Sequence, residues 1–430
     1  MKHSRGIIFF IVLIFLFALR LAYGLCSEFW FEDELQVYLI GLRYYTTGVF
    51  PYFGPDIVYT ATQIPGALLG LLVGLPFFLV QIPEAPYILL NLLSFAVLCL
   101  FGAYLQKKFT ETPSWFLWIW IMTCPWVMNL STHVFNPSYV LFGSVLFFIG
   151  FFEAVRSLRI GFVKIPLAFF MMGFALFWVY QLHMSWVLLV PFVFYAFWKS
   201  FFENKLSVPA FFAGCLLPAL LLLPAYFKFG FHEGGGLASN VEFNFSNVKE
   251  FFTLMLRYLS LASNEIPRFI DTDGASRLCF FRDYLYAVPF LLFAILSGFL
   301  QVAYMLISFF MRNPVKGFRQ VKWILFFTLM FTWFSFFFSV KGPSSHTFYV
   351  LFPLVMLYSF YCWQPLFRKK WFGILMMLML FSGIVTNITL AYHNYHVKSL
   401  YKKRELPRKA IQQKNYHILG ERRASERNPE

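Results

Sequence analysis

Three consecutive acidic residues, Glu32, Asp33 and Glu34, directly follow the first apolar segment of the chain. Apolar side chains then recur at helical spacing, which predicts an amphipathic helix whose first turn carries the acids. These apolar positions are Leu35, Tyr38, Leu39, Leu42 and Tyr45. A helix N-terminus favours ionised carboxylates, and a carboxylate fixed on a rigid helix can act as a general base toward a hydroxyl group. The alternative interpretation is an acid cluster that only caps the start of the helix.

Other polar side chains stand beside prolines or near the ends of apolar runs, where they could meet a substrate at the membrane surface. They are Gln63, His133, Asn136, Gln181, His183, Lys341 and His346. Amide and imidazole groups can hydrogen-bond hydroxyls, and cations can hold an anionic group. The segment 228–283 adds the arginines Arg257, Arg268, Arg277 and Arg282. The alternative is that the histidines are satisfied interfacial residues, that Lys341 anchors the chain at the interface, and that most of these arginines are solvated or paired.

The elements that position these residues must lie in a membrane, because the composition excludes a soluble protein. Of 430 residues, 60% are hydrophobic, 22% are aromatic and only 13% are charged. A soluble domain usually carries about a quarter charged residues, so this chain has too little polar surface to cover a globule in water. Intrinsic disorder is excluded as well, because it requires low hydrophobicity and high charge. We therefore predict an all-α polytopic membrane protein.

Apolar runs separated by basic loops predict about eleven transmembrane helices. The first, Gly6–Leu25, follows Lys2 and Arg5 and is expected to be an uncleaved span with its N-terminus inside. The run Ile64–Val80 is rich in proline and glycine, and placing it at the surface puts the later basic loops inside. The other spans are expected near Glu84–Gln106, Ser114–Leu130, Ser138–Val155, Ile165–Gln181, Ser185–Trp198, Val208–Tyr226, Tyr284–Phe310, Trp323–Val340, Thr347–Trp363 and Trp371–Tyr392.

Charge and composition also divide the chain. The formal net charge of +15 fits basic cytoplasmic loops, and without a nucleic-acid-binding motif no nucleic-acid partner is expected. The expected parts are residues 1–227, which include a first outer loop at 26–83, a long outer loop at 228–283, C-terminal spans at 284–392 and a basic tail at 393–430. An odd number of spans puts the tail outside whereas its charge favours the inside, so its side is left open. Arg20, near the outer end of the first span, is expected to snorkel or to pair with a carboxylate.

A string of residues in the first outer loop, Asp33-Glu34 followed by Tyr38, Gly48 and Pro65-Gly66, resembles the corresponding loop of GT-C glycosyltransferases. The resemblance is to the bacterial enzymes that are similar to protein O-mannosyltransferases and to the lipid A aminoarabinose transferase. Three later segments are also similar to family motifs: Thr132–Pro137, Gln181–Ser185 and Lys341–Tyr349. The resemblance implies a GT-C-like helix bundle with surface-lying helices in the first outer loop.

The resemblance also implies an activity, namely sugar transfer from a polyprenyl-phosphate-linked donor to an acceptor hydroxyl by direct displacement. Asp33 would take the proton from the hydroxyl, and Glu34 would orient the site or bind the acceptor. Cations aimed at the leaving lipid phosphate should lower the barrier, and the candidates are Lys341, His346, His183, and Arg268 or Arg282. The acceptor would be a glycan, a lipid or a protein. The enzyme would lie in a bacterial inner membrane, with its site on the extracytoplasmic side.

The sequence departs from the metal-binding members of this family at two positions. Gln63 stands where they have a glutamate, and Asn136 stands where they have an aspartate. No metal site and no other cofactor is therefore assigned, and dependence on a divalent metal is left open. Gln63 and Asn136 would instead hydrogen-bond sugar hydroxyls, although Asn136-Pro137 could equally be a simple turn. His133 and Gln181 are counted with them as substrate-binding candidates.

Three other classes of membrane protein remain as alternatives. A lipid or solute transporter without transferase activity usually places ionisable residues at mid-membrane and contains internal repeats. Here no repeat is found and the charges gather at the outer surface, which favours an enzyme. A polysaccharide polymerase or ligase would share the lipid-linked chemistry, and a membrane assembly subunit would have no catalytic role. Replacing Asp33 by Asn separates an enzyme from a scaffold.

Overall fold

The computed structural model describes residues 2–27, 32–57, 62–200, 203–230, 243–266, 269–270, 274–312, 315–339, 342, 344–397 and 400–420. Its α-helices are α1 (Lys2–Ser27), α2 (Glu32–Thr47), α3 (Leu68–Leu79), α4 (Ala85–Lys108), α5 (Ser114–Thr123), α6 (Pro125–Leu130), α7 (Val140–Ala154), α8 (Ile165–Tyr180), α9 (Val190–Ser200), α10 (Ser207–Ala219), α11 (Leu223–Phe229), α12 (Phe251–Ser260), α13 (Gly274–Asp283), α14 (Val288–Phe310), α15 (Phe318–Ser335), α16 (Phe352–Trp363), α17 (Lys370–Val397) and α18 (Leu400–Gln412). The strands are β1 (Phe53–Ile57) and β2 (Thr62–Pro65), and the 3₁₀ turns are η1 (Met184–Leu189), η2 (Leu220–Leu222), η3 (Phe245–Glu250), η5 (Leu285–Ala287), η6 (Phe336–Phe338), η7 (Ser345–Leu351), η8 (Gln364–Arg368) and η9 (Tyr416–Leu419).

Seven of the described helical segments are long and apolar enough to cross a bilayer, as expected for an all-α membrane protein. They are Gly6–Ser27, Ala85–Lys108, Ser207–Phe229, Leu285–Phe310, Phe318–Phe338, Ser345–Arg368 and Lys370–Val397. The expected number of about eleven is not confirmed, because four of the predicted spans form shorter apolar helices. The expected span Ser114–Leu130, for example, divides into α5 and α6 at Pro125, since proline cannot donate the hydrogen bond that continues a helix.

The described bundle has a buried central helix and an apolar outside. α16 is buried from Phe352 to Trp363 and packs against α7, α14 and α15. Around it, α1 and α14 expose large apolar side chains, among them Phe10, Phe15 and Phe299. Exposed apolar surface of this extent fits a surrounding of lipid rather than water.

The segment after the first membrane-length helix folds into a unit of α2, β1, β2 and α3, which we call the first-loop unit. Its two helices pack closely because small residues face each other: a Cβ on Gly41 would lie 2.6 Å from the backbone nitrogen of Gly74. A Cβ on Gly70 would collide with Pro51. The glycines of the run Ile64–Val80 therefore serve close helix packing. α3 forms over 12 residues of this run, too few to be among the seven membrane-length helices.

The β1–β2 hairpin was not expected from the sequence. Phe53 pairs with Pro65, and Asp56 pairs with Gln63, in an antiparallel arrangement. β1 contains Gly54 and Pro55, residue types that are depleted in strands, so the local pattern carries no strand signal. The hairpin matters for the site because it places Asp56 and Gln63 side by side.

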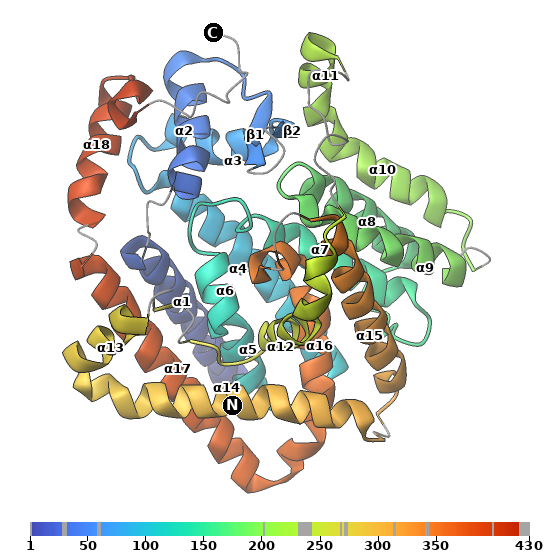
Figure 1. Ribbon diagram of the computed structural model, residues 1–430. Helices are drawn as coiled ribbons and strands as arrows, with labels where there is room; N and C mark the ends of the chain where they lie inside the picture. Colours follow the sequence, from blue (N-terminus) through green and yellow to red (C-terminus); the bar gives the residue numbers. More distant parts are fainter. Residues whose placement is uncertain are drawn as a thin grey trace.

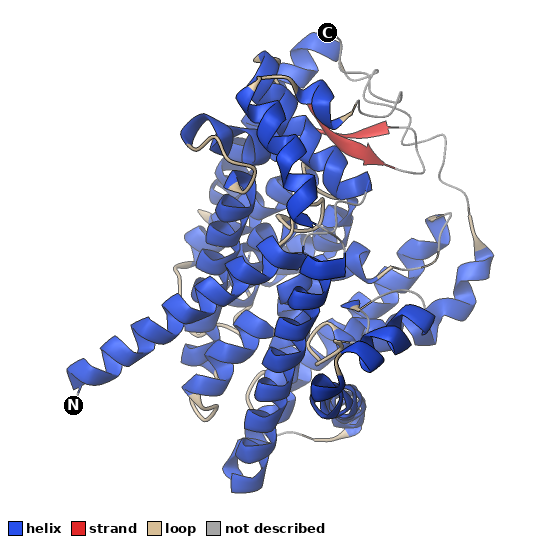
Figure 2. Ribbon diagram, turned by 90° about the vertical axis from the view of Figure 1, so that its left-hand side faces the viewer, coloured by secondary structure: helices blue, strands red, loops and turns tan. Residues whose placement is uncertain are grey.

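The C-terminal tail returns to the first-loop unit. α18 and the first-loop unit lie at the same end of the molecule (Figure 1), whereas the N-terminus projects at the other end (Figure 2). Arg404 of α18 donates hydrogen bonds to the Leu25 carbonyl at the end of α1 and to Glu84. The Arg43 guanidinium of α2 lies over the Tyr416 ring of η9, 5.9 Å from its centroid. The described part of the tail, α18 and η9, therefore packs beside the first-loop unit.

Candidate functional site

The two adjacent acids in the first turn of α2 have different surroundings. Asp33 is exposed to solvent, whereas Glu34 is only 5% exposed. Neighbouring residues on a helix point about 100° apart, so one side chain can face outward while the next faces the protein. Of the two acids, Asp33 is therefore the one whose carboxylate a substrate in the surrounding solvent can contact.

Gln63 on β2 is held by Asp56 on β1. Gln63 Nε2 donates to Asp56 Oδ1 at 3.1 Å, and Gln36 Nε2 of α2 donates to Asp56 Oδ2 at 2.6 Å. The Asp56 carboxylate thus links the hairpin to α2 and fixes the orientation of the Gln63 amide. Sequence reasoning missed Asp56 as a positioning residue, because its partners meet only through the unexpected hairpin.

His133 links the end of α1 to α6. Its Nδ1 atom lies 2.7 Å from the Asn129 carbonyl oxygen, and its Nε2 atom lies 3.0 Å from Ser27 Oγ. The side chain is buried, and both ring nitrogens face protein groups. This arrangement matches the interpretation of His133 as a satisfied interfacial histidine. Asn136 follows in the same loop, and its Oδ1 atom is buried without a hydrogen-bond partner among the described residues.

Gln181, directly after α8, contacts the first-loop unit. Its Nε2 atom donates to the Pro218 carbonyl oxygen at 2.7 Å. Its side chain lies against Gly66, where any Cβ would collide with the amide. Gly66 has a φ of 102°, a conformation that glycine adopts without strain. The pair Gly66 and Gln181 therefore joins the end of β2 to the end of α8.

His183 faces His346, so the structure brings these two candidates together. Their ring centroids lie 6.4 Å apart, with His183 at the start of η1 and His346 on η7. His183 Nδ1 accepts a hydrogen bond from the Ser185 backbone N–H at 3.1 Å. The exposed His346 has its Nδ1 atom 2.9 Å from Ser344 Oγ. We call Gly66, Gln181, His183 and His346 the junction.

The protonation state of His183 follows from its surroundings. Burial, reinforced by the neighbouring His346, lowers the pKa of His183 to about 3. The ring is therefore neutral at pH 7, and because its Nδ1 atom accepts from Ser185, its proton must lie on Nε2. His183 can thus donate one hydrogen bond, and a positive charge at this pair would have to come from His346.

No contact among the described residues joins the three remaining cation candidates, Lys341, Arg268 and Arg282, to the junction. Lys341 and Arg268 lie outside the described residues. Arg282, at the end of α13, is exposed and pairs with the adjacent Asp283 at 3.2 Å. An exposed pair of this kind contributes little to stability.

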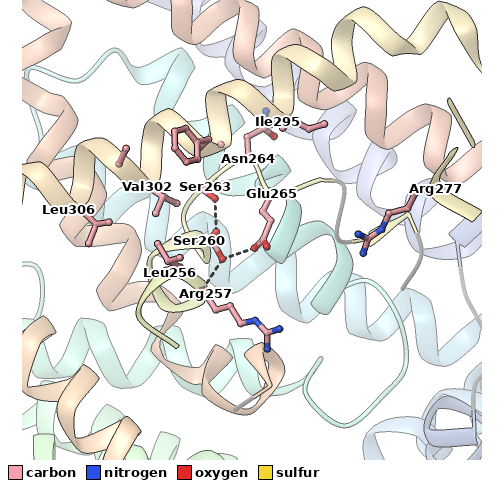
Figure 3. A pocket seen from close by; sticks show the side chains of 13 residues that line it. Leu256, Arg257, Ser260, Ser263, Asn264, Glu265, Arg277, Ile295, Val302 and Leu306 are labelled. Carbon is pink, nitrogen blue, oxygen red and sulfur yellow. Dashed lines mark hydrogen bonds between the residues drawn. The ribbon is translucent and has the colours of Figure 1, made fainter. Parts of the chain in front are cut away.

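A cavity of about 520 Å³ lies between α12, α13 and α14. Its polar lining comes from Arg257, Ser260, Ser263, Asn264, Glu265 and Arg277. Figure 3 shows Ser260, Ser263 and Glu265 gathered near one another, with Val302 and Leu306 on the neighbouring α14. Sequence reasoning proposed Arg268 and Arg282 from this segment, whereas the structure places Arg257 and Arg277 in the cavity. Glu265 carried no sequence signal, because an isolated glutamate in a loop matches no motif.

Arg20 contradicts the sequence expectation. It is fully buried, and it neither snorkels to the surface nor bonds to a carboxylate among the described residues. Its Nη1 atom donates to the Met122 carbonyl oxygen at 2.8 Å, and Nη2 donates to Ser131 Oγ at 2.8 Å and to Ser94 Oγ at 3.3 Å. The guanidinium finds neutral acceptors because α1, α4, α5 and α6 converge around it, and it holds them together.

No group of three or more His, Cys, Asp or Glu side chains that could hold a metal ion occurs in the described part of the chain. Fold and composition indicate a polytopic all-α membrane protein with an acidic residue exposed at the start of its first-loop unit. No known protein family, curated protein or solved structure matches this chain.

Proposed function

We propose that this protein transfers a sugar from a polyprenyl-phosphate-linked donor to an acceptor hydroxyl at the outer face of a bacterial inner membrane. The observation that carries the proposal is the exposure of Asp33 beside the buried Glu34. An exposed carboxylate on a packed helix is accessible to an acceptor hydroxyl, and a general base must come within hydrogen-bond reach of the proton that it takes. The apolar outside of the bundle supports the choice of a lipid-carried donor.

In the proposed reaction, Asp33 takes the proton of the acceptor hydroxyl as its oxygen attacks the anomeric carbon. The bond between that carbon and the phosphate oxygen breaks, and the lipid phosphate leaves with the electron pair. Glu34, which is buried beside it, would orient the site. His346 and the Nε2–H of His183 would stabilise the leaving phosphate. Lys341 is proposed to assist them because it lies five positions before His346 in the chain.

We also propose which helical segments cross the membrane. In a GT-C-like bundle of about eleven spans, the apolar segments that form α5–α6, α7, α8 and η1–α9 would cross the membrane together with the seven longer helices. The contact between Gly66 and Gln181 supports this arrangement, because it sets the first-loop unit against the end of α8. Gln63 and Asn136 would then contribute amide groups to a sugar, and the acceptor would be a glycan, a lipid or a protein.

A lipid or solute transporter remains the second candidate, and one observation favours it. Arg20 is an ionisable residue buried within an apolar, membrane-length helix, as is typical of transport pathways. However, both of its Nη atoms are bound to structural acceptors on α4, α5 and the end of α6. This arrangement fits a helix-joining role, so we prefer the transferase.

The proposal is tested by a transfer assay in membranes that contain the full chain. A panel of polyprenyl-phosphate sugars, radiolabelled in the sugar, is supplied, and the label is followed into new lipid, glycan or protein products. Asp33→Asn should lower transfer by at least about 100-fold, the usual contribution of a general base. Asp283→Asn, which changes an exposed aspartate on α13, should retain it.

Thermal unfolding of both variants checks that they fold like the wild type. Undiminished transfer by Asp33→Asn would overturn the role of Asp33. If no member of the panel yields a product above that of membranes without the protein, the transferase proposal fails and the transporter is favoured.

A further inference from the structure

A second cavity, a groove of about 210 Å³, lies between α9 and α15. Its walls include Phe192 and Tyr195 of α9 and Ile324 and Phe327 of α15. Phe327 is 64% exposed, so the groove opens at the surface of the bundle. Because α15 belongs to a helical segment of membrane-spanning length, this surface is of the kind that faces the hydrocarbon chains of lipids.

The groove offers a bound molecule mainly apolar contacts. The polar side chains described in its lining are Tyr195 and Thr328, and both are engaged within the protein. Tyr195 accepts a hydrogen bond from Gln320 Nε2 at 3.0 Å, and Thr328 Oγ1 donates to the Ile324 carbonyl oxygen at 2.6 Å. From Ile324 to Phe331 the groove follows α15 for about 10 Å. An apolar groove of this length fits a stretch of hydrocarbon chain.

A cation lies at one end of this groove. Lys199 is exposed and follows Tyr195 by one helical turn, and its Nζ atom lies over the Tyr195 ring, 5.6 Å from the centroid. It also lies over the Trp198 ring, 4.5 Å from the centroid. Aromatic faces attract the ammonium group through their quadrupole but do not neutralise its charge. Glu203, one turn further along the chain, is bound to Arg159. Lys199 therefore brings an uncompensated positive charge to the end of an apolar groove.

The cation belongs to a surface built from several segments that connect the helices. Lys107 Nζ donates to the Gly161 carbonyl oxygen at 2.9 Å, and Arg159 pairs with Glu203 at 3.0 Å, so three of these segments are in contact. The hydrogen bond between α9 and α15 brings in the start of α15. We call this surface the basic end, and it consists of the segments 107–113, 155–164, 199–206 and 311–322.

The acids of the basic end do not offset its positive charge. Its only acids are Glu111 and Glu203, and each pairs with an arginine, at 2.9 Å and 3.0 Å. Residues 201–202 and 313–314 lie outside the described residues, and the sequence gives them no charge. The neighbouring Glu153, at the end of α7, is buried and accepts hydrogen bonds from two backbone N–H groups. The cations that remain are more numerous, among them Lys199, Arg312, Lys316 and Arg319.

We propose that the groove between α9 and α15 binds one acyl chain of an anionic phospholipid whose headgroup lies at Lys199. The apolar walls take up the chain, and the basic end attracts the negative headgroup, since each Lys or Arg near a membrane surface adds to the attraction of anionic lipid. A zwitterionic phospholipid has the same chains but no net charge, so it gains only the groove. The site shares no residue with the proposed transfer machinery, and it does not depend on the proposed function.

The test uses the purified full chain in detergent and a phosphatidylglycerol that carries a photoreactive diazirine on one acyl chain. After illumination, peptide mass spectrometry locates the label, which we expect in α9 and in the first half of α15. Unlabelled dioleoyl phosphatidylglycerol should suppress this labelling at a concentration at least about fivefold lower than dioleoyl phosphatidylcholine, the effect of one cation near an anionic headgroup.

Three variants separate the contributions of charge and groove. Lys199→Gln should weaken competition by phosphatidylglycerol about fivefold and leave competition by phosphatidylcholine unchanged. Lys370→Gln, which removes an exposed cation at the start of α17, outside the basic end, should change neither. Ile324→Trp fills the groove without altering charge and should abolish labelling of α9 and α15. Thermal unfolding checks that the variants fold like the wild type.

The position of the label and the preference between the two lipids are measured on the wild type, so they decide the proposal even where a variant fails to fold. Equal competition by the two lipids would overturn the proposal, because bulk lipid would then fill the groove without regard to charge. Label spread evenly over the membrane-length helices would also overturn it, as would an unchanged lipid preference in a folded Lys199→Gln variant. No sugar transfer is measured, so the outcome is independent of the transfer assay.

Discussion

At the scale of single residues, side chains of one type have different roles that their sequence context does not distinguish. His133 and His183 both lie beside apolar runs, yet His133 faces protein groups with both nitrogens, whereas His183 faces His346. Which groups surround a residue depends on segments far away in the chain, and local patterns carry little of that information. Asp56 and Glu265 were missed for the same reason, since their partners come from other elements.

The neutral state of His183 makes stability depend on pH. Unfolded histidine takes up a proton below about pH 6.5, but the folded ring, with its pKa lowered to about 3, does not. Stability is therefore fully present above about pH 6.5 and declines as the pH falls toward 3. His183→Asn keeps an acceptor for the Ser185 N–H but does not titrate, so it should reduce the fall in melting temperature between pH 7 and pH 5. An unchanged fall would contradict this assignment.

Arg20 should be important for stability. Arg20→Gln cannot reach all three acceptors, so Met122 O, Ser94 Oγ and Ser131 Oγ lose a charged donor. We expect a loss of about 1.5–3 kcal/mol of unfolding free energy, the range for hydrogen bonds to a charged group. Thermal unfolding in one detergent measures the change. Arg312→Gln, at an exposed position, should stay within about 0.5 kcal/mol of wild type, and a similar loss in both variants would refute the special role of Arg20.

At the scale of elements, the helices formed by long apolar runs could be predicted from the sequence. The hairpin and the close helix packing between these helices could not. The expected span Tyr284–Phe310 corresponds closely to α14, because uninterrupted apolar sequence forms a helix wherever it is buried or surrounded by lipid. The β1–β2 hairpin could not be predicted, because Gly54 and Pro55 disfavour strands and only pairing with β2 makes one. The close packing of α2 on α3 likewise needs both partners, although the glycines of α3 were visible in the sequence.

That packing leads to a prediction about glycine. A Cβ at Gly74 would lie 2.7 Å from the Gly41 carbonyl oxygen, so Gly74→Leu must push α2 away from α3. We expect it to lower the melting temperature and, because α2 carries Asp33, to lower transfer as well. Gly373→Ala, in α17, has no atom within 4 Å of the new Cβ and should be neutral or stabilise by about 0.5–1 kcal/mol. If Gly74→Leu melts and transfers like wild type, α2 and α3 do not pack as described.

At the scale of the whole molecule, the C-terminal tail contacts the first-loop unit and the end of α1. Arg404 of α18 bonds to the end of α1 and to Glu84, and Tyr416 lies against Arg43 of α2. The charge of the tail and the odd number of predicted spans gave opposite answers for the side of the membrane on which the tail lies. Neither feature contains information on contacts between residues about 380 positions apart. The tail therefore packs against and supports α2, the helix that carries Asp33.

Removing the chain after residue 397 should loosen the first-loop unit without unfolding the bundle. The amides of α2 should exchange hydrogen faster, because their region loses the Arg43–Tyr416 and Arg404 contacts. The amides of α7, which packs against α8 and α16, should be unaffected. Hydrogen exchange measured by mass spectrometry compares the two helices. Unchanged exchange in α2 would show that the tail does not support it.

The candidate site joins these scales, and the sequence anticipated only part of it. The candidate residues could be chosen from the sequence because acids, amides and histidines at the ends of apolar runs can be recognised there. The juxtaposition of His183 with His346, and of Gln181 with Gly66, depends on how η1, η7 and β2 meet in space. The cavity lined by Arg257 and Arg277 depends on the position of α14, which no motif indicates.

A single-turnover experiment with purified protein in proteoliposomes tests the role of Asp33 as the general base. The protein is mixed in excess with a polyprenyl-phosphoryl sugar and its acceptor, and the free lipid phosphate and the glycosylated product are quantified over time. We predict that wild type forms both in equal amounts and that Asp33→Asn leaves the donor intact, because the acceptor proton has no base. Donor cleavage and product formation by Asp33→Asn at the wild-type rate would show that Asp33 is not the base.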